Sequence, residues 1–288
     1  MTIGLRPLEP SDWIAWFPDH DAQLQEKERV LVAQSDVLSA LPEAKLASAE
    51  LVAKLGRQLP RELPRHYRAE GRRLQVMATG ARVDLDCDGL EAMRTAARLV
   101  PDDLVVMLPD ADDTYILAAA ALCFPTRWRL ADKVGHPMLA IHAPVPGYAE
   151  QIGRATDKVM SKITAERPLW RQNWSIVDSP ALYQPVRIPM PAPRTPAEAG
   201  EHFWLRSERQ CLVRLPRSRA VVFSIRILQV SVAQACTQPG VAASLVEQIE
   251  TMPDSLRGYK QLQDAASPLR EYLRSALAAE QSQPPHHA

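Results

Sequence analysis

Two histidines lie close together in a segment that is otherwise mostly apolar. Residues 128–148 contain His136 and His142, and His142 is followed by Ala-Pro-Val-Pro. An imidazole held by rigid, apolar backbone is a suitable single axial ligand for haem iron. A histidine that is simply hydrogen-bonded inside a core would have the same surroundings. The spacing alone leaves both interpretations open.

A second set of chemically capable residues lies in the sequence LRSERQCLVRLP, which predicts a strand over residues 205–216. With the two-residue period of a strand, Arg206, Glu208 and Gln210 share one face. Buried charge is costly unless it is paired, so charged residues on an inward face often mark a site. If this face points to water instead, the same residues are ordinary solvated charges.

Three further polar residues are candidates on the neighbouring strands. Arg226 is the only charged residue within residues 220–232. It can pair with Glu208 across a hairpin or lean over a ligand, and an ordinary salt bridge between strands is the alternative. Arg171 and Asn173, in the sequence WRQNW, can bind a carboxylate or cap a turn.

Composition argues against several classes of protein. The chain has 288 residues, with Lys+Arg 34 and Asp+Glu 34, whereas a protein that binds duplex nucleic acid normally has a basic excess. The sequence contains no GxGxxG, no GxxxxGK[ST] and no CxxC, so a dinucleotide fold, a P-loop and a zinc knuckle have no support. No run of about 20 apolar residues occurs, and we do not expect the segment MTIGLRPLEPSDW to act as a signal peptide, because it lacks a continuous apolar stretch. We therefore expect a cytoplasmic protein that binds neither nucleic acid nor membrane.

The elements that must position these residues follow from apolar periodicity and from the 25 prolines. Helices are expected over residues 20–59 (two helices, broken near Pro42), 91–99, 148–166, 242–252 and 255–279. Strands are expected over residues 80–85, 104–108 and 170–177, with a hairpin formed by 203–215 and 220–232. Residues 115–124 leave two interpretations open: alanine favours a helix, but the short length and the closing Pro125 suit a buried strand. This order predicts an α+β fold with an antiparallel sheet.

Three segments in this order resemble the family of haem-dependent oxidative N-demethylases. They are DDTYILAAAALCFPTRWRLADKVGHPMLAIHAPVP, WRQNWSI and LRSERQCLVRLPRSRAVVFSIRI, and weaker likeness extends over most of the chain. The resemblance implies a PAS-like antiparallel sheet with haem-binding helices and additional N- and C-terminal helices. It also implies an α subunit that uses O2 to oxidise a small secondary amine, such as dimethylamine, to methylamine and formaldehyde.

The cofactor implied by the resemblance is haem b with its iron. Flavin, a 2Fe–2S cluster and tetrahydrofolate are expected only on reductase-type partner subunits, with NADPH as the electron source. The resemblance makes His142 the expected iron ligand, with His136 as the second choice. The residues expected to bind the cofactor are His142, Arg171, Asn173, Lys133 and Arg129.

The chemistry of such a reaction suggests roles for the polar residues of the predicted strands. Glu208 is expected to bind the ammonium group of the substrate. Arg206 or Arg226 is expected to polarise dioxygen or to keep Glu208 ionised. The expected apolar walls are Leu212, Phe223 and Ile225.

Two alternatives to an enzyme remain open at this point. One is a haem-binding PAS-type gas or redox sensor without turnover, and the other is an adaptor subunit whose haem site has decayed. In each case we expect an N-terminal helical extension at residues 1–75, a haem-binding core at 76–235, and C-terminal helices with a disordered tail at 236–288.

Overall fold

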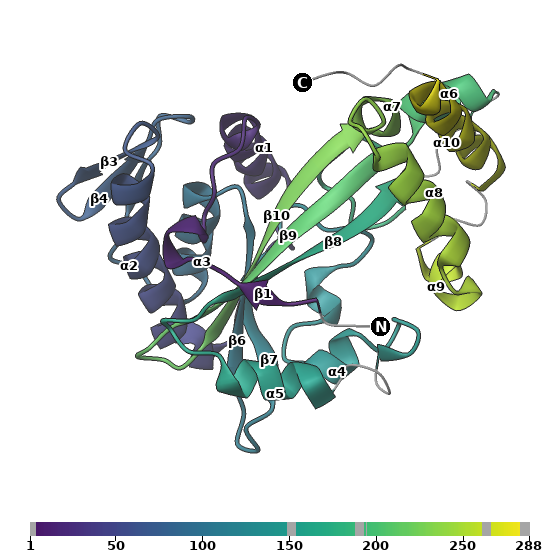
Figure 1. Ribbon diagram of the computed structural model, residues 1–288. Helices are drawn as coiled ribbons and strands as arrows, with labels where there is room; N and C mark the ends of the chain where they lie inside the picture. The colour runs from purple at the N-terminus through teal and green to yellow at the C-terminus, as the bar shows by residue number, and fades with distance from the viewer. Residues whose placement is uncertain (1–3, 149–153, 188–192, 194, 261–265, 283–288) are drawn as a thin grey trace.

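A seven-stranded antiparallel sheet forms the centre of the computed structural model (Figure 1), which describes residues 4–148, 154–187, 193, 195–260 and 266–282. The spatial order of its strands is β1-β8-β9-β10-β6-β7-β2. These strands are β1 (Arg6–Pro7), β2 (Leu38–Ala40), β6 (Asp103–Pro109), β7 (Tyr115–Ala121), β8 (Leu169–Val177), β9 (Trp204–Arg214) and β10 (Val221–Ser231). The α+β class and the antiparallel sheet predicted from the sequence are confirmed.

The longest pairing in the sheet is the hairpin of β9 and β10, which the sequence predicted. Each strand has 11 residues, and the register runs from Trp204 opposite Ser231 to Arg214 opposite Val221. The β-branched run of β10 favours a pleated conformation. Arg219, in the connecting turn, has a φ of 60°, in the left-handed region that tight turns use.

Residues 115–121 form a buried strand, although four of the seven are alanine. Alanine favours helices, but β7 lies between β6 and β2 in the sheet, so tertiary context decides its conformation. The small side chains allow α3 (Gly89–Leu99) to pack against this strand. The strand interpretation of this segment is confirmed.

The two faces of the sheet are covered by different helices. On one face, α1 (His20–Ala33), α2 (Lys45–Glu62) and α3 share an apolar core with residues such as Val106 and Val222. On the other face lie η3 (Leu130–Asp132), α4 (Met138–Ile141) and α5 (Arg154–Lys162). There Val105 and Met107 pack with Leu130 and Ile141. Alternation along β6 therefore divides neighbouring residues between two cores.

The C-terminal helices form a third apolar cluster at the far ends of β8 and β9 (Figure 1). They are α6 (Pro196–His202), α7 (Val232–Ala235), α8 (Val241–Thr251), α9 (Asp254–Tyr259) and α10 (Ala266–Gln281). The single helix expected over 255–279 is wrong, because α9 ends at Tyr259 before α10 begins. Helix α6 was not predicted; Thr195 caps it by accepting the N–H of Glu198, and Pro196 opens its first turn.

The N-terminal region departs from its sequence prediction in two ways. The break between the first two helices is longer than expected, since it holds β2 and η2 (Pro42–Ala44). A second, three-stranded sheet consists of β3 (Tyr67–Glu70), β4 (Arg73–Val76) and β5 (Arg82–Asp84), of which only β5 was predicted. Their pairing partners, rather than apolar periodicity, define these short polar strands.

The residues before α1 dock through one tryptophan. Trp13, which follows η1 (Pro10–Asp12), is buried, and its Nε1–H donates to Ser224 Oγ at 3.0 Å. Trp16, in contrast, is 46% exposed. Part of the expected helix over 148–166 and the expected tail lie outside the described residues, and the predicted domain division stays a prediction. No helix in the described part of the chain is long and apolar enough to cross a membrane.

Candidate functional site

The imidazole of His142 follows directly on α4, on the sheet face that η3, α4 and α5 cover. Its Nδ1 lies 3.0 Å from the carbonyl oxygen of Met138, one turn earlier. A carbonyl only accepts, so Nδ1 carries the proton and Nε2 keeps its lone pair. The ring stacks on Tyr148, with centroids 4.4 Å apart and an interplanar angle of 11°. Nε2 has no hydrogen-bond partner among the residues that the structure describes. An anchored Nδ1–H with an available Nε2 is the usual arrangement of a histidine that ligates a metal.

The surroundings of His142 keep it neutral. Burial lowers its pKa below the ordinary histidine value, the bond to Met138 opposes that effect, and the charges of Lys133 and Arg171 lower the pKa further. A neutral imidazole is the form that binds a metal. Within the described residues, no group of three or more His, Cys, Asp or Glu is placed to hold a metal ion. A single free imidazole nitrogen fits haem iron, whose macrocycle supplies the remaining equatorial ligands.

His136, the second-choice ligand, lies at the surface. Its side chain is exposed, and its backbone carbonyl accepts the N–H of Leu117 at 3.0 Å. The segment therefore runs along the edge of β7 at this point and does not direct the imidazole inward. Burial and hydrogen bonding favour His142 over His136 as the ligand.

The carboxylate of Glu208 is held on β9 by three neutral donors. Its Oε1 accepts from Thr126 Oγ1 at 3.3 Å, and its Oε2 accepts from Gln210 Nε2 at 2.8 Å and Asn173 Nδ2 at 3.3 Å. Glu208 makes no ion pair with any described residue. The carboxylate is thus oriented without being neutralised, and it can accept a hydrogen bond from a cationic ligand.

Arg171 interacts with both Glu208 and His142, by hydrogen bonds through Gln210 and by its charge, respectively. Its Nε donates to Gln210 Oε1 at 2.8 Å, and Gln210 in turn donates to Glu208. Burial lowers the pKa of Arg171, while the charge of Glu208 and the nearby Tyr148 oppose this shift. The charge of Arg171 also lowers the pKa of His142. We refer to His142, Arg171, Gln210 and Glu208, together with the residues that contact them, as the polar region.

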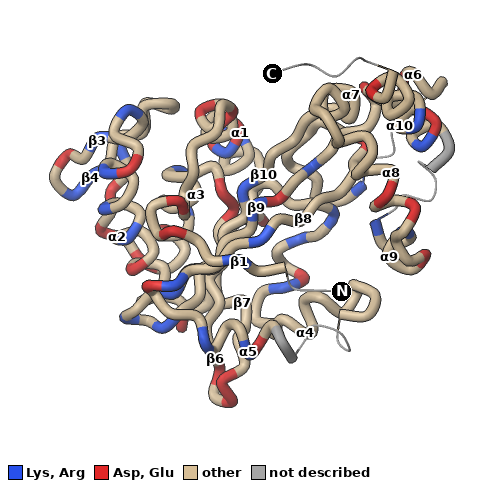
Figure 2. Tube along the Cα trace, viewed as in Figure 1, with Lys and Arg blue, Asp and Glu red and all other residues tan. Residues whose placement is uncertain are grey.

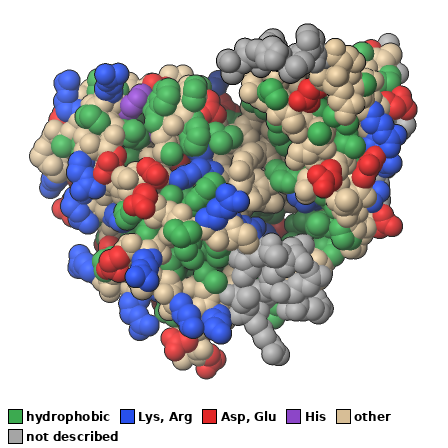
Figure 3. Space-filling view, in the orientation of Figure 1, with side chains coloured by type: hydrophobic (Ala, Val, Ile, Leu, Met, Phe, Trp, Pro, Cys, Tyr) green, Lys and Arg blue, Asp and Glu red, His purple; other side chains and the backbone are tan. Residues whose placement is uncertain are grey.

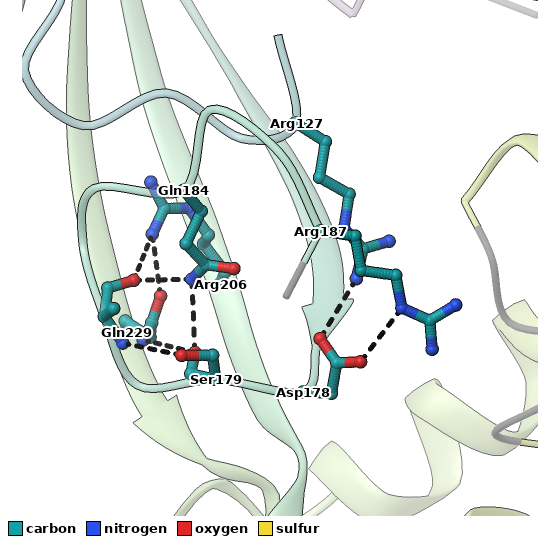
Figure 4. A network of polar contacts seen from close by, with 8 residues as sticks. Arg127, Asp178, Ser179, Gln184, Arg187, Arg206 and Gln229 are labelled. Carbon is teal, nitrogen blue, oxygen red and sulfur yellow. Dashed lines mark hydrogen bonds and ion pairs between the residues drawn. The ribbon is translucent and has the colours of Figure 1, made fainter. Parts of the chain in front are cut away.

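Arg206 is fully buried and is held by neutral partners (Figure 4). Its guanidinium donates to the carbonyl of Phe124 at 2.7 Å, to Gln229 Oε1 at 2.9 Å and to Thr126 Oγ1 at 2.9 Å. Burial lowers its pKa to about 10. Arg206 therefore acts on Glu208 through the hydroxyl of Thr126, which it orients, and not by direct contact.

The same close view shows a second polar group beside Arg206 (Figure 4). The carboxylate of Asp178 forms ion pairs with the guanidinium groups of Arg127 at 3.3 Å and Arg187 at 3.1 Å. Gln184 donates to the carbonyl of Ser179 at 3.2 Å. These contacts fix the connection that follows β8 against the segment that carries Thr126.

The expected pairing of Arg226 with Glu208 is wrong. In the β9–β10 register, Glu208 lies opposite Ile227, so the side chain of Arg226 points to the other face of the sheet. There its guanidinium binds Asp19 at 2.5 Å and the amide oxygen of Gln23, both near the start of α1. A difference of one residue in register changes the face, which the sequence did not reveal.

Lys133 and Arg129 lie near His142 in sequence but have separate surroundings. Lys133 Nζ donates to the carbonyl of Ile141 at 2.5 Å and lies 5.4 Å from the ring centroid of Trp128, so it steadies the end of α4. Arg129 is exposed and lines a separate hollow of about 10 Å³. That volume suits a single water molecule, not a porphyrin.

Sequence reasoning missed three contributors to this region: Thr126, Tyr148 and Lys260. Tyr148 stands six residues after His142, within the same Pro-rich segment, and was available as a local signal. Lys260 lies at the end of α9, and burial lowers its pKa while Glu208 opposes that effect. Only the tertiary structure brings Lys260 to the polar region.

The fold thus presents a neutral, anchored imidazole and an oriented carboxylate on one face of the antiparallel sheet. The family model described as "Haem-dependent oxidative N-demethylase, alpha subunit-like" matches residues 4–269. The chain belongs to this family, as the sequence resemblance predicted. The match contains His142, Arg171 and Glu208, and it covers the N-terminal helices and most of the C-terminal ones.

Proposed function

We propose that this chain is the haem-binding subunit of an enzyme that oxidises a small secondary amine such as dimethylamine. The observation that carries the proposal is the presence of His142, with a free Nε2, and Glu208 in one polar region. The overall reaction consumes the amine, O2, two electrons and two protons, and yields methylamine, formaldehyde and water. The electrons would come from NADPH through partner subunits that carry flavin, a 2Fe–2S cluster and tetrahydrofolate.

The residues present fit a haem held without covalent attachment. His142 Nε2 would ligate the iron, and the bond from Nδ1 to Met138 would keep the ring in the required orientation. Arg171 offers a half-buried cation for a propionate, while Lys133 steadies α4. Bound haem supplies the activation of dioxygen, and the protein supplies binding, orientation and electrostatics.

Glu208 would bind the substrate. One of its oxygens would accept an N–H of the dialkylammonium ion, while Thr126, Asn173 and Gln210 keep the carboxylate in place. The neighbouring positions on β10 are apolar, with Ile225 opposite Gln210. Apolar side chains next to a carboxylate suit an ion with two methyl groups.

A PAS-type core, as the family resemblance implies, is part of the proposal. The spatial order β7-β6-β10-β9-β8 places the five long strands as second, first, fifth, fourth and third in the chain. The connection between β7 and β8 carries η3, α4 and α5 on one face. This ordering and the position of His142 in that connection support the assignment.

The haem assignment is tested by two histidine substitutions. Wild type and His136→Ala, reconstituted with hemin, are expected to show the same Soret band and the same shift on reduction with dithionite. His142→Ala is expected to bind hemin at least about tenfold more weakly, because the axial bond is lost. Equal spectra and affinities for His142→Ala and wild type would contradict the assignment of the ligand.

The substrate assignment is tested by Glu208→Gln. This variant keeps the size of the side chain and should retain haem, but it loses the charge that orients the ammonium ion. We expect turnover of dimethylamine to fall by about 100-fold or more. Glu201→Gln, at an exposed position of α6, is the matched control and should behave as wild type. A wild-type protein that binds haem and oxidises no amine in the presence of reductant would instead support the sensor alternative.

A further inference from the structure

Most of the acceptor capacity of Glu208 is used within the protein. An ionised carboxylate has two oxygens and about four lone-pair positions. Oε2 accepts from Gln210 Nε2 at 2.8 Å and from Asn173 Nδ2 at 3.3 Å, and Oε1 accepts from Thr126 Oγ1 at 3.3 Å. Among the described residues, both positions on Oε2 thus have donors, and one position on Oε1 stays open. Glu208 is half-buried, so its side chain is in part accessible from solvent.

Two of these donors have a fixed direction, because each also accepts from an arginine. Arg206 Nε donates to Thr126 Oγ1 at 2.9 Å, so the single hydroxyl proton is directed to Glu208. Arg171 Nε donates to Gln210 Oε1 at 2.8 Å, so the amide NH2 group faces Glu208. Reversing either group would break its bond to an arginine. Both donors therefore keep their protons on the carboxylate when a ligand binds.

The third donor is positioned by the sheet. Asn173 on β8 lies directly opposite Glu208 on β9, and Ile227 on β10 lies opposite Glu208 on the other side. Directly opposite residues share a face and have Cβ atoms about 5 Å apart, so the register itself brings the amide to the carboxylate. Ile227 has no polar side-chain atom to offer. The neighbours of Glu208 on the two strands are thus one committed amide and one apolar side chain.

We propose that Glu208 holds its ligand through a single N–H, which Oε1 accepts, so that the site takes tertiary as well as secondary alkylammonium ions. This inference rests on the proposed function and extends its substrate class. Dimethylammonium and trimethylammonium can each donate that one hydrogen bond. Tetramethylammonium has the same charge but no N–H, so it forms no hydrogen bond and leaves Oε1 incompletely satisfied.

Asn173 has a defined part in this selection. Its amide occupies a position on Oε2, so an ion with two N–H groups cannot bridge the two oxygens. Asn173→Leu keeps the approximate shape of the side chain but opens that position. Dimethylammonium can then donate to both oxygens, whereas trimethylammonium still has one N–H to give. Gln172→Leu removes the neighbouring amide, which donates to Ser207 Oγ at 2.6 Å and not to Glu208, and it is the matched control.

A purely structural role for these hydrogen bonds gives a different expectation. They would then only join β8 and the segment of Thr126 to β9, and Glu208 would attract small cations by charge alone. Calorimetry of the hemin-reconstituted protein at pH 7, with the chlorides of the three ions, separates the two cases. In the wild type, dimethylammonium and trimethylammonium should bind within about threefold of each other and at least about tenfold more tightly than tetramethylammonium. That comparison needs no variant.

In Asn173→Leu, the affinity for dimethylammonium relative to trimethylammonium should rise by about tenfold, because one charge-assisted hydrogen bond is added. The ratio is compared, since loss of a structural contact would change both affinities alike. Gln172→Leu should keep the wild-type ratio. Equal binding of tetramethylammonium and dimethylammonium by the wild type, or an unchanged ratio in folded Asn173→Leu, would overturn this inference alone. A wild-type protein that binds hemin but none of the three ions would contradict the proposed substrate as well.

Discussion

Two histidines on opposite faces of the sheet, the half-buried His142 and the fully buried His20, are kept neutral by different surroundings. His142 is held by the carbonyl of Met138 in α4, and its Nε2 has no hydrogen-bond partner among the described residues. His20, on α1, bonds through Nε2 to the hydroxyl of Tyr67 at 2.9 Å, and that hydroxyl donates to the carbonyl of Leu99 at 2.7 Å. His20 therefore donates to Tyr67, and the bond contributes to the docking of α1.

His20 should make stability depend on pH. Burial, and next the charge of Arg226, lower its pKa from 6.5 to about 4, so between these values the unfolded chain binds a proton that the folded chain does not. Folding stability thus rises with pH across this window and is lost as pH falls. The full effect is about 3 kcal/mol, with about 2 kcal/mol of it between pH 7 and 5.

Urea unfolding at pH 7 and pH 5 measures this effect. The loss of stability on acidification should be about 2 kcal/mol smaller in His20→Gln than in wild type. His136→Gln changes an exposed histidine and should parallel wild type. Parallel pH dependence in His20→Gln and wild type would show that His20 titrates normally in the folded state.

At the scale of elements, strand β9 contributes residues both to the apolar core and to the candidate site. Arg206, Glu208 and Gln210 lie on the face of the polar region, while Cys211 and Val213 pack into the core under α1, α2 and α3. Period-two alternation makes this division possible within a single strand. The rigid hairpin thus fixes the carboxylate by the same pairing that fixes the core.

The segment that carries Thr126 is held in place from the other side of the sheet. Asp103, at the start of β6, accepts the N–H groups of Cys123 and Phe124 at 2.8 and 2.7 Å. Its carboxylate also pairs with Lys27 of α1 at 3.4 Å, with both side chains buried. Helix α1 is therefore connected through Asp103 to the segment that orients Glu208.

Loss of the buried pair between Lys27 and Asp103 should lower the free energy of unfolding. Asp103→Asn leaves the ammonium of Lys27 without its carboxylate partner, and we expect the free energy of unfolding to fall by about 3 kcal/mol. Glu250→Gln, which breaks the exposed pair with Arg274, should change it by less than about 1 kcal/mol. Denaturant unfolding of both variants at pH 7 checks the contrast, and similar small losses would mean that Asp103 is not energetically important.

At the scale of the molecule, the candidate site is assembled from regions that lie far apart in the sequence. The connection after β7 supplies His142, β8 and β9 supply Arg171 and Glu208, and α9 supplies Lys260. The space-filling view shows the surface hollowed between the C-terminal helices and the body of the molecule (Figure 3). Lys260, directly after α9, contacts Trp174, so this helix adjoins strand β8.

The surface charges are mixed over the whole chain. Lys and Arg are interspersed with Asp and Glu over the molecule (Figure 2), in agreement with the equal totals of 34 and 34. Such a surface provides little long-range electrostatic steering. The charges that matter for the proposed chemistry are the few that the fold gathers on one sheet face.

Local patterns in the sequence were enough to predict the α+β class, the β9–β10 hairpin and the shared face of Arg206, Glu208 and Gln210. These features depend on alternation, β-branched runs and turn residues, which act over a few neighbouring residues. The residues at 142, 171 and 208 were also nominated from the sequence. Their roles stay proposals, although the structure places all three in one polar region.

Only the tertiary structure decided which face Arg226 occupies, that residues 115–121 form a strand, and that Lys260 reaches Trp174. Each outcome depends on strand register or on packing between distant segments, and local periodicity contains no information about either. A shift of one residue in register reverses a face, and a helix that is remote in sequence becomes a neighbour only after the chain has folded.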